Sequence, residues 1–93
     1  MEIDFRNNEG SGQYEAVRDG RVVGVAQYRL LDKTIVFTHT EVDQDLRGKG
    51  VSQRLVEYAL DDVRNSGRSV VPRCEFVRDY IAEHPRYGDL LAA

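Results

Sequence analysis

The chain has 93 residues, of which 41% are hydrophobic and 31% charged, and its formal net charge is −3. A chain of this length has room for one domain with one core, and its negative charge argues against general binding to nucleic acid, which needs a surplus of basic residues facing the phosphates. The single cysteine excludes an internal disulfide, and because no cysteine or histidine cluster has zinc-site spacing, we expect no structural metal.

The first third of the chain is predicted to form β-strands, because apolar residues recur at mostly even spacings among polar ones. Turn-forming sequences separate the runs at Asn7-Asn8-Glu9-Gly10, at Asp19-Gly20 and at Leu31-Asp32-Lys33. We therefore expect an antiparallel meander of three strands that leads into a fourth. The apolar residues of this meander are Ile3, Phe5, Tyr14, Ala16, Val23, Val25 and Tyr28.

The fourth run, residues 34–42, alternates in polarity and is expected to be a central strand. Strict alternation predicts two faces, one with Ile35, Phe37, His39 and Glu41 and the other with Val36, Thr38, Thr40 and Val42.

A first helix is predicted after this strand, because Val51, Leu55, Ala59 and Val63 repeat at helical spacing. We expect it to begin near Gly50 and to stop at Gly67, since glycine takes the left-handed conformation at little cost.

A short strand follows at residues 69–71 and ends at Pro72, which cannot donate to a β-ladder. A second helix is predicted over residues 75–83, with His84-Pro85 as its stop. The apolar residues of the tail, Tyr87, Leu90 and Leu91, are expected to dock on the rest of the domain.

The sequence Arg47-Gly48-Lys49-Gly50 lies between the fourth strand and the first helix. Glycines at such a turn suit a phosphate ligand, because the backbone can approach closely and unpaired N–H groups at the helix start point outward. Arg47 and Lys49 add positive charge. The residues alone leave open a plain tight connection with two solvated cations, and neither the dinucleotide-binding nor the Walker motif fits the loop.

This loop resembles the acetyl-CoA loop of the GNAT superfamily, Gln/Arg-x-x-Gly-x-Gly/Ala, with Gly48 and Gly50 at its two small positions. The segments Pro72-Arg73-Cys74-Glu75-Phe76-Val77 and His84-Pro85-Arg86-Tyr87, and the helix between them, resemble the small YjdJ-type branch of that superfamily. Asp45 stands where the motif prefers Gln or Arg, so contacts to the cofactor are expected from the backbone rather than from this side chain.

The resemblance implies an α/β (α+β) fold over residues 1–93, with a mixed, mostly antiparallel sheet of about five strands and two helices. Two central strands, one ending at Val42 and one near Val71, would splay to form the CoA cleft. Main-chain groups near Val42 would pair with the pantetheine. The diphosphate would lie on the loop and helix start, which comprise Arg47, Gly48, Lys49, Gly50, Val51 and Ser52.

Acetyl transfer to an amine requires removal of a proton and stabilisation of an oxyanion. His39 is the preferred base, because histidine is the side chain that titrates near neutral pH, and Glu41 on the same face is the second candidate. The alternatives are a strand histidine whose ring is hydrogen-bonded in or beside the core for His39, and a solvated strand carboxylate, the favoured reading, for Glu41.

Two further residues are candidates for the chemistry. Cys74 precedes a helix, where the positive end of the helix dipole favours a thiolate, and the resemblance places it beside the thioester. A small buried residue is the alternative. Tyr80 resembles the tyrosine that reprotonates the CoA thiolate in many GNAT enzymes, although its position also suits packing.

The resemblance implies an N-acetyltransferase that acts by direct attack or through acetyl-Cys74, with acetyl-CoA as cosubstrate and no metal. The acceptor is expected to be an amine on a large molecule or a small polyamine, in an open site. A non-catalytic acyl-CoA-binding module and a ligand-free interaction domain are the alternatives. We expect a cytoplasmic monomer or weak homodimer that binds neither membranes nor nucleic acid, because residues 1–6 do not read as a secretory signal and no apolar run approaches the roughly 20 residues of a membrane span.

Overall fold

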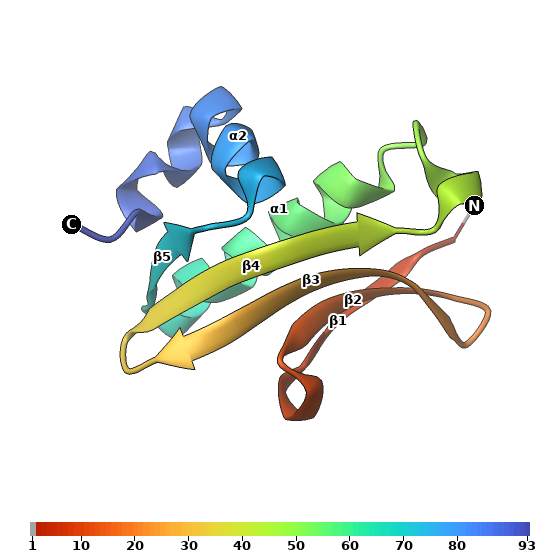
Figure 1. Cartoon of the computed structure of the whole chain (residues 1–93), viewed down its shortest axis with the longest axis horizontal. Coiled ribbons are helices and arrows are strands. Elements are labelled where there is room, and N and C mark those ends of the chain that lie inside the picture. The colour runs from red at the N-terminus through yellow and green to blue at the C-terminus, as the bar shows by residue number, and fades with distance from the viewer. Residues whose placement is uncertain (1) are drawn as a thin grey trace.

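The computed structural model describes residues 2–93, and five strands follow one another across its sheet in sequence order (Figure 1). The strands are β1 Asp4–Asn8, β2 Gln13–Arg18, β3 Arg21–Leu31, β4 Thr34–Val42 and β5 Ser69–Pro72. The helices are α1 Val51–Ser66 and α2 Glu75–Glu83, with short 3-10 turns η1 Glu9–Ser11, η2 Gln44–Leu46 and η3 Pro85–Leu90. Strands β1 to β4 are antiparallel and β5 is parallel to β4, so the predicted mixed, mostly antiparallel sheet is confirmed.

The turn between β2 and β3 explains why this hairpin could be predicted. Asp19 and Gly20 have φ values of 52° and 77°, and a tight hairpin turn of this kind needs the left-handed region at both central residues. At the earlier predicted turn, the side chain of Asn8 accepts a hydrogen bond from the N–H of Ser11 and closes η1.

Both helices pack on one face of the sheet. Figure 1 shows α1 passing behind β4, and residues of α1 and α2 share a single core with that face. The predicted apolar stripe of α1 is buried, and Gly50 and Gly67, both left-handed, bound the helix. Two phenols fasten the helix, since Tyr14 donates to Asp62 and Tyr87 to Asp61, each at 2.7 Å. None of the helices in residues 2–93 combines the length and apolar character needed to span a bilayer.

The C-terminal tail docks as predicted. Tyr87 is fully buried and Leu90 nearly so, whereas Leu91 remains 43% exposed. The N–H of Ala92 donates to the carbonyl of Val70 at 2.9 Å, so the tail runs along the outer edge of β5.

The opposite face of the sheet carries no helix in the described chain. Near β1 and β2 it is occupied by a polar cluster around Glu15, whose buried carboxylate accepts from Arg6 and Gln13 at 2.6 Å each and from Asn8 at 3.1 Å. Burial alone would raise the pKa of Glu15, but these three hydrogen bonds hold it below its ordinary value. The buried carboxylate at this end of the open face therefore has its hydrogen-bond partners within the protein.

Strand β4 contains a β-bulge. Tyr28 of β3 lies opposite Phe37, but the preceding residue, Gln27, lies opposite His39. Thr38 is therefore an extra residue on β4, and the side chains beyond it exchange faces.

The predicted assignment of faces along β4 is wrong for this reason. Phe37 is 1% exposed in the core, whereas the His39 side chain is 55% exposed on the open face. Ile35 and Phe37 thus face the helices while His39 and Glu41 do not, and Thr40 and Val42 lie on the helix side, opposite to Val36 and Thr38.

Candidate functional site

The sheet splits beside the bulge. Strands β4 and β5 pair only from Thr34 to Phe37, and the last contact is the N–H of Cys74 donating to the carbonyl of Phe37 at 2.9 Å. The chain then enters α2, while β4 continues to Val42 with β3 alone as its neighbour. The expected splay of the strand ending at Val42 from the strand ending near Val71 is confirmed, although β5 is the edge strand of the described sheet and not a central one, and the splay leaves one edge of residues 38–42 without a partner strand.

Main-chain groups of β4 point into this split. The N–H of Asp43 donates to the carbonyl of Val23 on β3 at 2.8 Å. Since successive residues of a strand turn their amides to opposite sides, Val42 and Thr40 direct theirs away from β3. This orientation agrees with the role expected for Val42 and adds Thr40, which the sequence did not single out.

Cys74 lies at the base of the split. It immediately precedes α2, is 8% exposed, and its Sγ is 3.3 Å from Thr40 Oγ1. His39 and Glu41 lie on the opposite face, with 3.9 Å between His39 Nε2 and Glu41 Oε1. The bulge therefore places the candidate thiol and the candidate bases on different sides of the sheet.

The glycine loop presents unused N–H donors. Within residues 2–93, the backbone N–H groups of Gly48, Gly50, Val51, Ser52 and Gln53 donate to no protein acceptor. This differs in part from the expectation for Arg47 to Ser52. The N–H groups of Arg47 and Lys49 are used by the carbonyls of Gln44 and Leu46, at 3.2 and 3.3 Å.

The side chains around this helix start are basic. None of the ion pairs found among residues 2–93 involves Arg47, Lys49 or Arg54. Arg54 instead lies over the ring of Phe5, 5.1 Å from its centroid. Unpaired donors at a helix N-terminus with cations beside them form an anion-binding surface.

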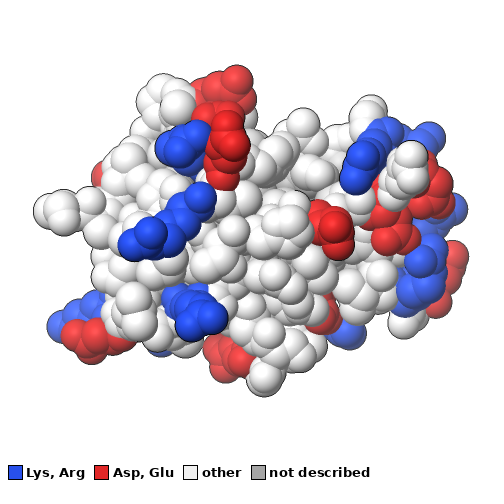
Figure 2. All heavy atoms as spheres, in the orientation of Figure 1, with Lys and Arg blue, Asp and Glu red and all other residues white. Residues whose placement is uncertain are grey.

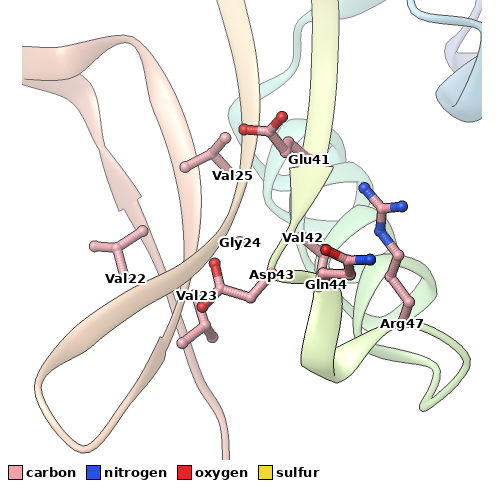
Figure 3. A pocket seen from close by; sticks show the side chains of 9 residues that line it. All are labelled: Val22, Val23, Gly24, Val25, Glu41, Val42, Asp43, Gln44 and Arg47. Carbon is pink, nitrogen blue, oxygen red and sulfur yellow. The ribbon is translucent and has the colours of Figure 1, made fainter.

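A hollow of about 310 Å³ lies between the end of β4 and the neighbouring stretch of β3, and Arg47 is the loop residue in its lining (Figure 3). Figure 3 shows the Glu41 side chain directed toward Val25 of β3, while Arg47 extends on the far side of β4. Glu41, Val42 and Arg47 therefore share one lining, which the sequence could not show.

Tyr80 lies between α1 and the tail and lines a hollow of about 260 Å³ together with Gln53 of the helix start. Its ring stacks on His84 at 3.9 Å between centroids, and His84 Nδ1 is 2.8 Å from the Tyr80 carbonyl oxygen. Burial raises the pKa of the Tyr80 phenol, and the carboxylate of Glu57 adds to the rise. These neighbours come from the middle of α1 and the end of α2, so the contacts of Tyr80 favour packing. Within residues 2–93, no three His, Cys, Asp or Glu side chains gather as a metal site.

The sequence model of the GCN5-related N-acetyl-transferase family matches residues 13–90. Protein NATD1 of Xenopus tropicalis is 32% identical over 85 residues, which cover 91% of this chain and 76% of that protein.

Two solved structures share the fold. A GCN5-like protein of Staphylococcus aureus, solved by NMR, superposes with a TM-score of 0.73 at 20% identity, covering 97% of this chain and 88% of that one. The ribosomal-protein-S18-alanine N-acetyltransferase of Escherichia coli superposes with a TM-score of 0.60 at 16% identity over 64% of this chain. The match spans only 39% of the Escherichia coli enzyme.

Proposed function

Because this chain belongs to the GCN5-related N-acetyltransferase family, whose members use acetyl-CoA, we propose that it transfers the acetyl group of acetyl-CoA to an amine. The observations that carry the proposal are the unpaired edge of β4 and the five free N–H groups at the start of α1, which follow one another along the chain through η2 and the glycine loop. An unpaired strand edge can bind an extended chain of amides, and free N–H groups at a helix start can bind phosphate.

The cosubstrate would lie along this path. Its diphosphate would accept hydrogen bonds from the N–H groups of Gly48 and residues 50–53, with Arg47 and Lys49 beside it. Its pantetheine amides would pair with the main chain of Val42 and Thr40. The thioester would then reach the base of the split, where the side chain of Cys74 lines the wall.

The acceptor amine would approach from the open face. There it would meet His39, which would take the proton through a water molecule as the amine nitrogen attacks the thioester carbon, with Glu41 close enough to attract the resulting imidazolium. A cleft-facing main-chain N–H of β4 would donate to the carbonyl oxygen as its negative charge develops. The C–S bond then breaks, and the departing thiolate takes up a proton.

Direct attack fits the surroundings of Cys74 better than an acetyl-cysteine intermediate. A nucleophilic thiol needs a base within hydrogen-bond reach. The neighbour that the structure gives Cys74 Sγ is the hydroxyl of Thr40, while His39 lies on the opposite face.

Thermal unfolding with added ligand tests the binding step. A ligand at a hundredfold excess over its dissociation constant adds about 2.7 kcal/mol to the free energy of unfolding, which raises the melting temperature of so small a domain by at least several degrees. We expect this rise with acetyl-CoA and with CoA at millimolar concentration. No rise with either ligand would contradict the proposal, and a rise without release of free CoA in an amine screen would indicate a binding module instead.

Intact-mass measurement tests the role of Cys74. Incubating the protein briefly with acetyl-CoA and no amine should add no acetyl group, and Cys74→Ala should keep transfer within about threefold of the wild type. Cys74→Ser is the matched control, because it retains a hydrogen-bonding group next to Thr40. An acetyl adduct that Cys74→Ala abolishes together with turnover would establish the covalent route and overturn direct attack.

A further inference from the structure

The open face of the sheet has a second hollow, at the end away from the glycine loop. Its volume is about 480 Å³, within the range of small-molecule sites. It is lined by the outward side chains of β3, β4 and β5, which the register sets side by side, with Arg29 opposite Val36 and Val36 opposite Val71. We call this hollow the arginine groove.

The floor of the arginine groove is apolar. Val36 is only 6% exposed although it lies on the face without helices, and Val71 beside it is half-buried. Leu31 extends the apolar lining toward the β3–β4 turn and is itself 63% exposed. Such a floor suits the aliphatic part of a ligand.

Two basic side chains line the arginine groove. Arg29 and Arg73 both line it, both are exposed, and neither takes part in an ion pair found among residues 2–93. The residues lining the groove include no carboxylate. Figure 2 shows this face as mostly uncharged surface, with basic side chains over its left half and acidic ones at the upper and lower margins. In a chain of net charge −3, two unpaired arginines at one hollow favour an anionic ligand.

One end of the groove reaches the bulge. Thr38 belongs to its lining, and His39 follows on the same face, at the mouth of the split. Arg73 comes directly after β5 at the level of Thr38, and Arg29 lies opposite Val36, two residues back along β4. His39 is three residues beyond Val36, a span of about 10 Å along a strand, part of which the long side chain of Arg29 can cover. A molecule with its amine at His39 can therefore place a group at Arg29 across a short aliphatic spacer.

We propose that the arginine groove holds the acceptor, and that the acceptor is a small amine whose other end is a carboxylate. The proposal rests on the proposed acetyltransferase function and names its substrate class. The carboxylate lies over Val36 between the guanidinium groups of Arg29 and Arg73, the spacer runs past Thr38, and the amine lies beside His39. A polyamine, which the sequence analysis allowed, places a second cation next to the arginines and is disfavoured by their charge.

The test compares two acceptors of similar length whose far ends carry opposite charges, δ-aminovalerate with a carboxylate and cadaverine with a second ammonium group. We expect the wild type to acetylate δ-aminovalerate with the higher kcat/KM. In Arg29→Glu/Arg73→Glu the ratio of the two kcat/KM values should fall by about tenfold or more and favour cadaverine. Lys33→Glu is the matched control, since Lys33 lies in the neighbouring turn outside the groove and should leave the ratio unchanged. Equal use of both acceptors, or a ratio unmoved by the double charge reversal, overturns the proposal.

Binding without catalysis separates this proposal from the proposed function. Adding glutarate to the protein without acetyl-CoA should shift the backbone amide NMR signals of Val36, Thr38 and Arg73 in the wild type and not in the double variant. If glutarate shifts these signals but acetyl-CoA does not bind, carboxylate binding in the arginine groove is supported and the proposed acetyltransferase function is contradicted. If acetyl-CoA binds but glutarate shifts no signals, the acetyltransferase function is supported and the arginine groove proposal is overturned. Shifts of these signals on simple dilution would identify a second copy of the chain as the occupant and overturn the proposal.

Discussion

Replacing Gly48 by valine is expected to weaken acetyl-CoA binding by roughly 100-fold, because two hydrogen bonds to a charged diphosphate, each worth about 1.5 kcal/mol or more, would be lost. A Cβ at Gly48 meets no atom within 4 Å, so the protein leaves room for the new side chain, and we expect it to occupy space that the proposed diphosphate needs. Titration followed by thermal unfolding or calorimetry measures the effect.

The control for this substitution is Gly67→Val at the other end of α1. Gly48 and Gly67 have φ values of 79° and 76°, and both have open space around an added Cβ. Each variant should therefore lose about 1–2 kcal/mol of folding stability from the left-handed backbone. Only Gly48→Val should lose binding. Wild-type affinity in Gly48→Val, or an equal loss in both variants, would show that the diphosphate lies elsewhere.

His39→Ala is expected to lower kcat by about 100-fold while leaving the dissociation constant of acetyl-CoA unchanged. The residue lies on the face from which we propose the amine arrives, away from the split that would hold the thioester. Because its side chain is 55% exposed, the free energy of unfolding should change by no more than about 0.5 kcal/mol. Steady-state kinetics with a saturating amine, together with a binding titration, separate the two effects.

Two variants control the His39 experiment. Gln27 lies opposite His39 on β3 and is also exposed, so Gln27→Ala should leave kcat near the wild-type value. Glu41→Gln should lose less than about tenfold, because its carboxylate acts only by attracting the charged imidazole. Unchanged turnover in His39→Ala would mean that the amine loses its proton to another group or to water.

Most of the fold could be predicted because its signals are local. The spacing of Val51, Leu55 and Ala59 is a property of one helix, and the glycines that bound it act through their own φ angles. The turn at Asp19-Gly20 needs only two residues. Each of these features is decided within a few positions of the chain, so the sequence contains what is needed to read it.

The bulge could not be read in this way, because an extra residue on one strand exists only relative to its partner. Alternation along residues 34–42 predicted one face for Phe37 and His39, and the register against β3 separated them. The same holds for Arg29 and Arg73. They are far apart in the sequence, and only the order of β3, β4 and β5 brings them to one hollow.

The N–H groups of the loop depend partly on the local sequence and partly on the surrounding structure. The glycines indicated where a phosphate could lie, but η2 decides which amides are free, since its carbonyls take the N–H groups of Arg47 and Lys49. The sequence therefore predicted which segment could hold a phosphate, and the structure shows which N–H groups of that segment are free.

The bulge at Thr38 also affects the routes by which the two substrates reach the reacting atoms. In the proposed arrangement the sheet separates the two substrates. The cosubstrate enters on the helix side and the amine on the face without helices. They meet only at the split between β4 and β5. Neither molecule blocks the other's way in or out. The architecture therefore imposes no order on their arrival and asks for no movement of the chain between one arrival and the next.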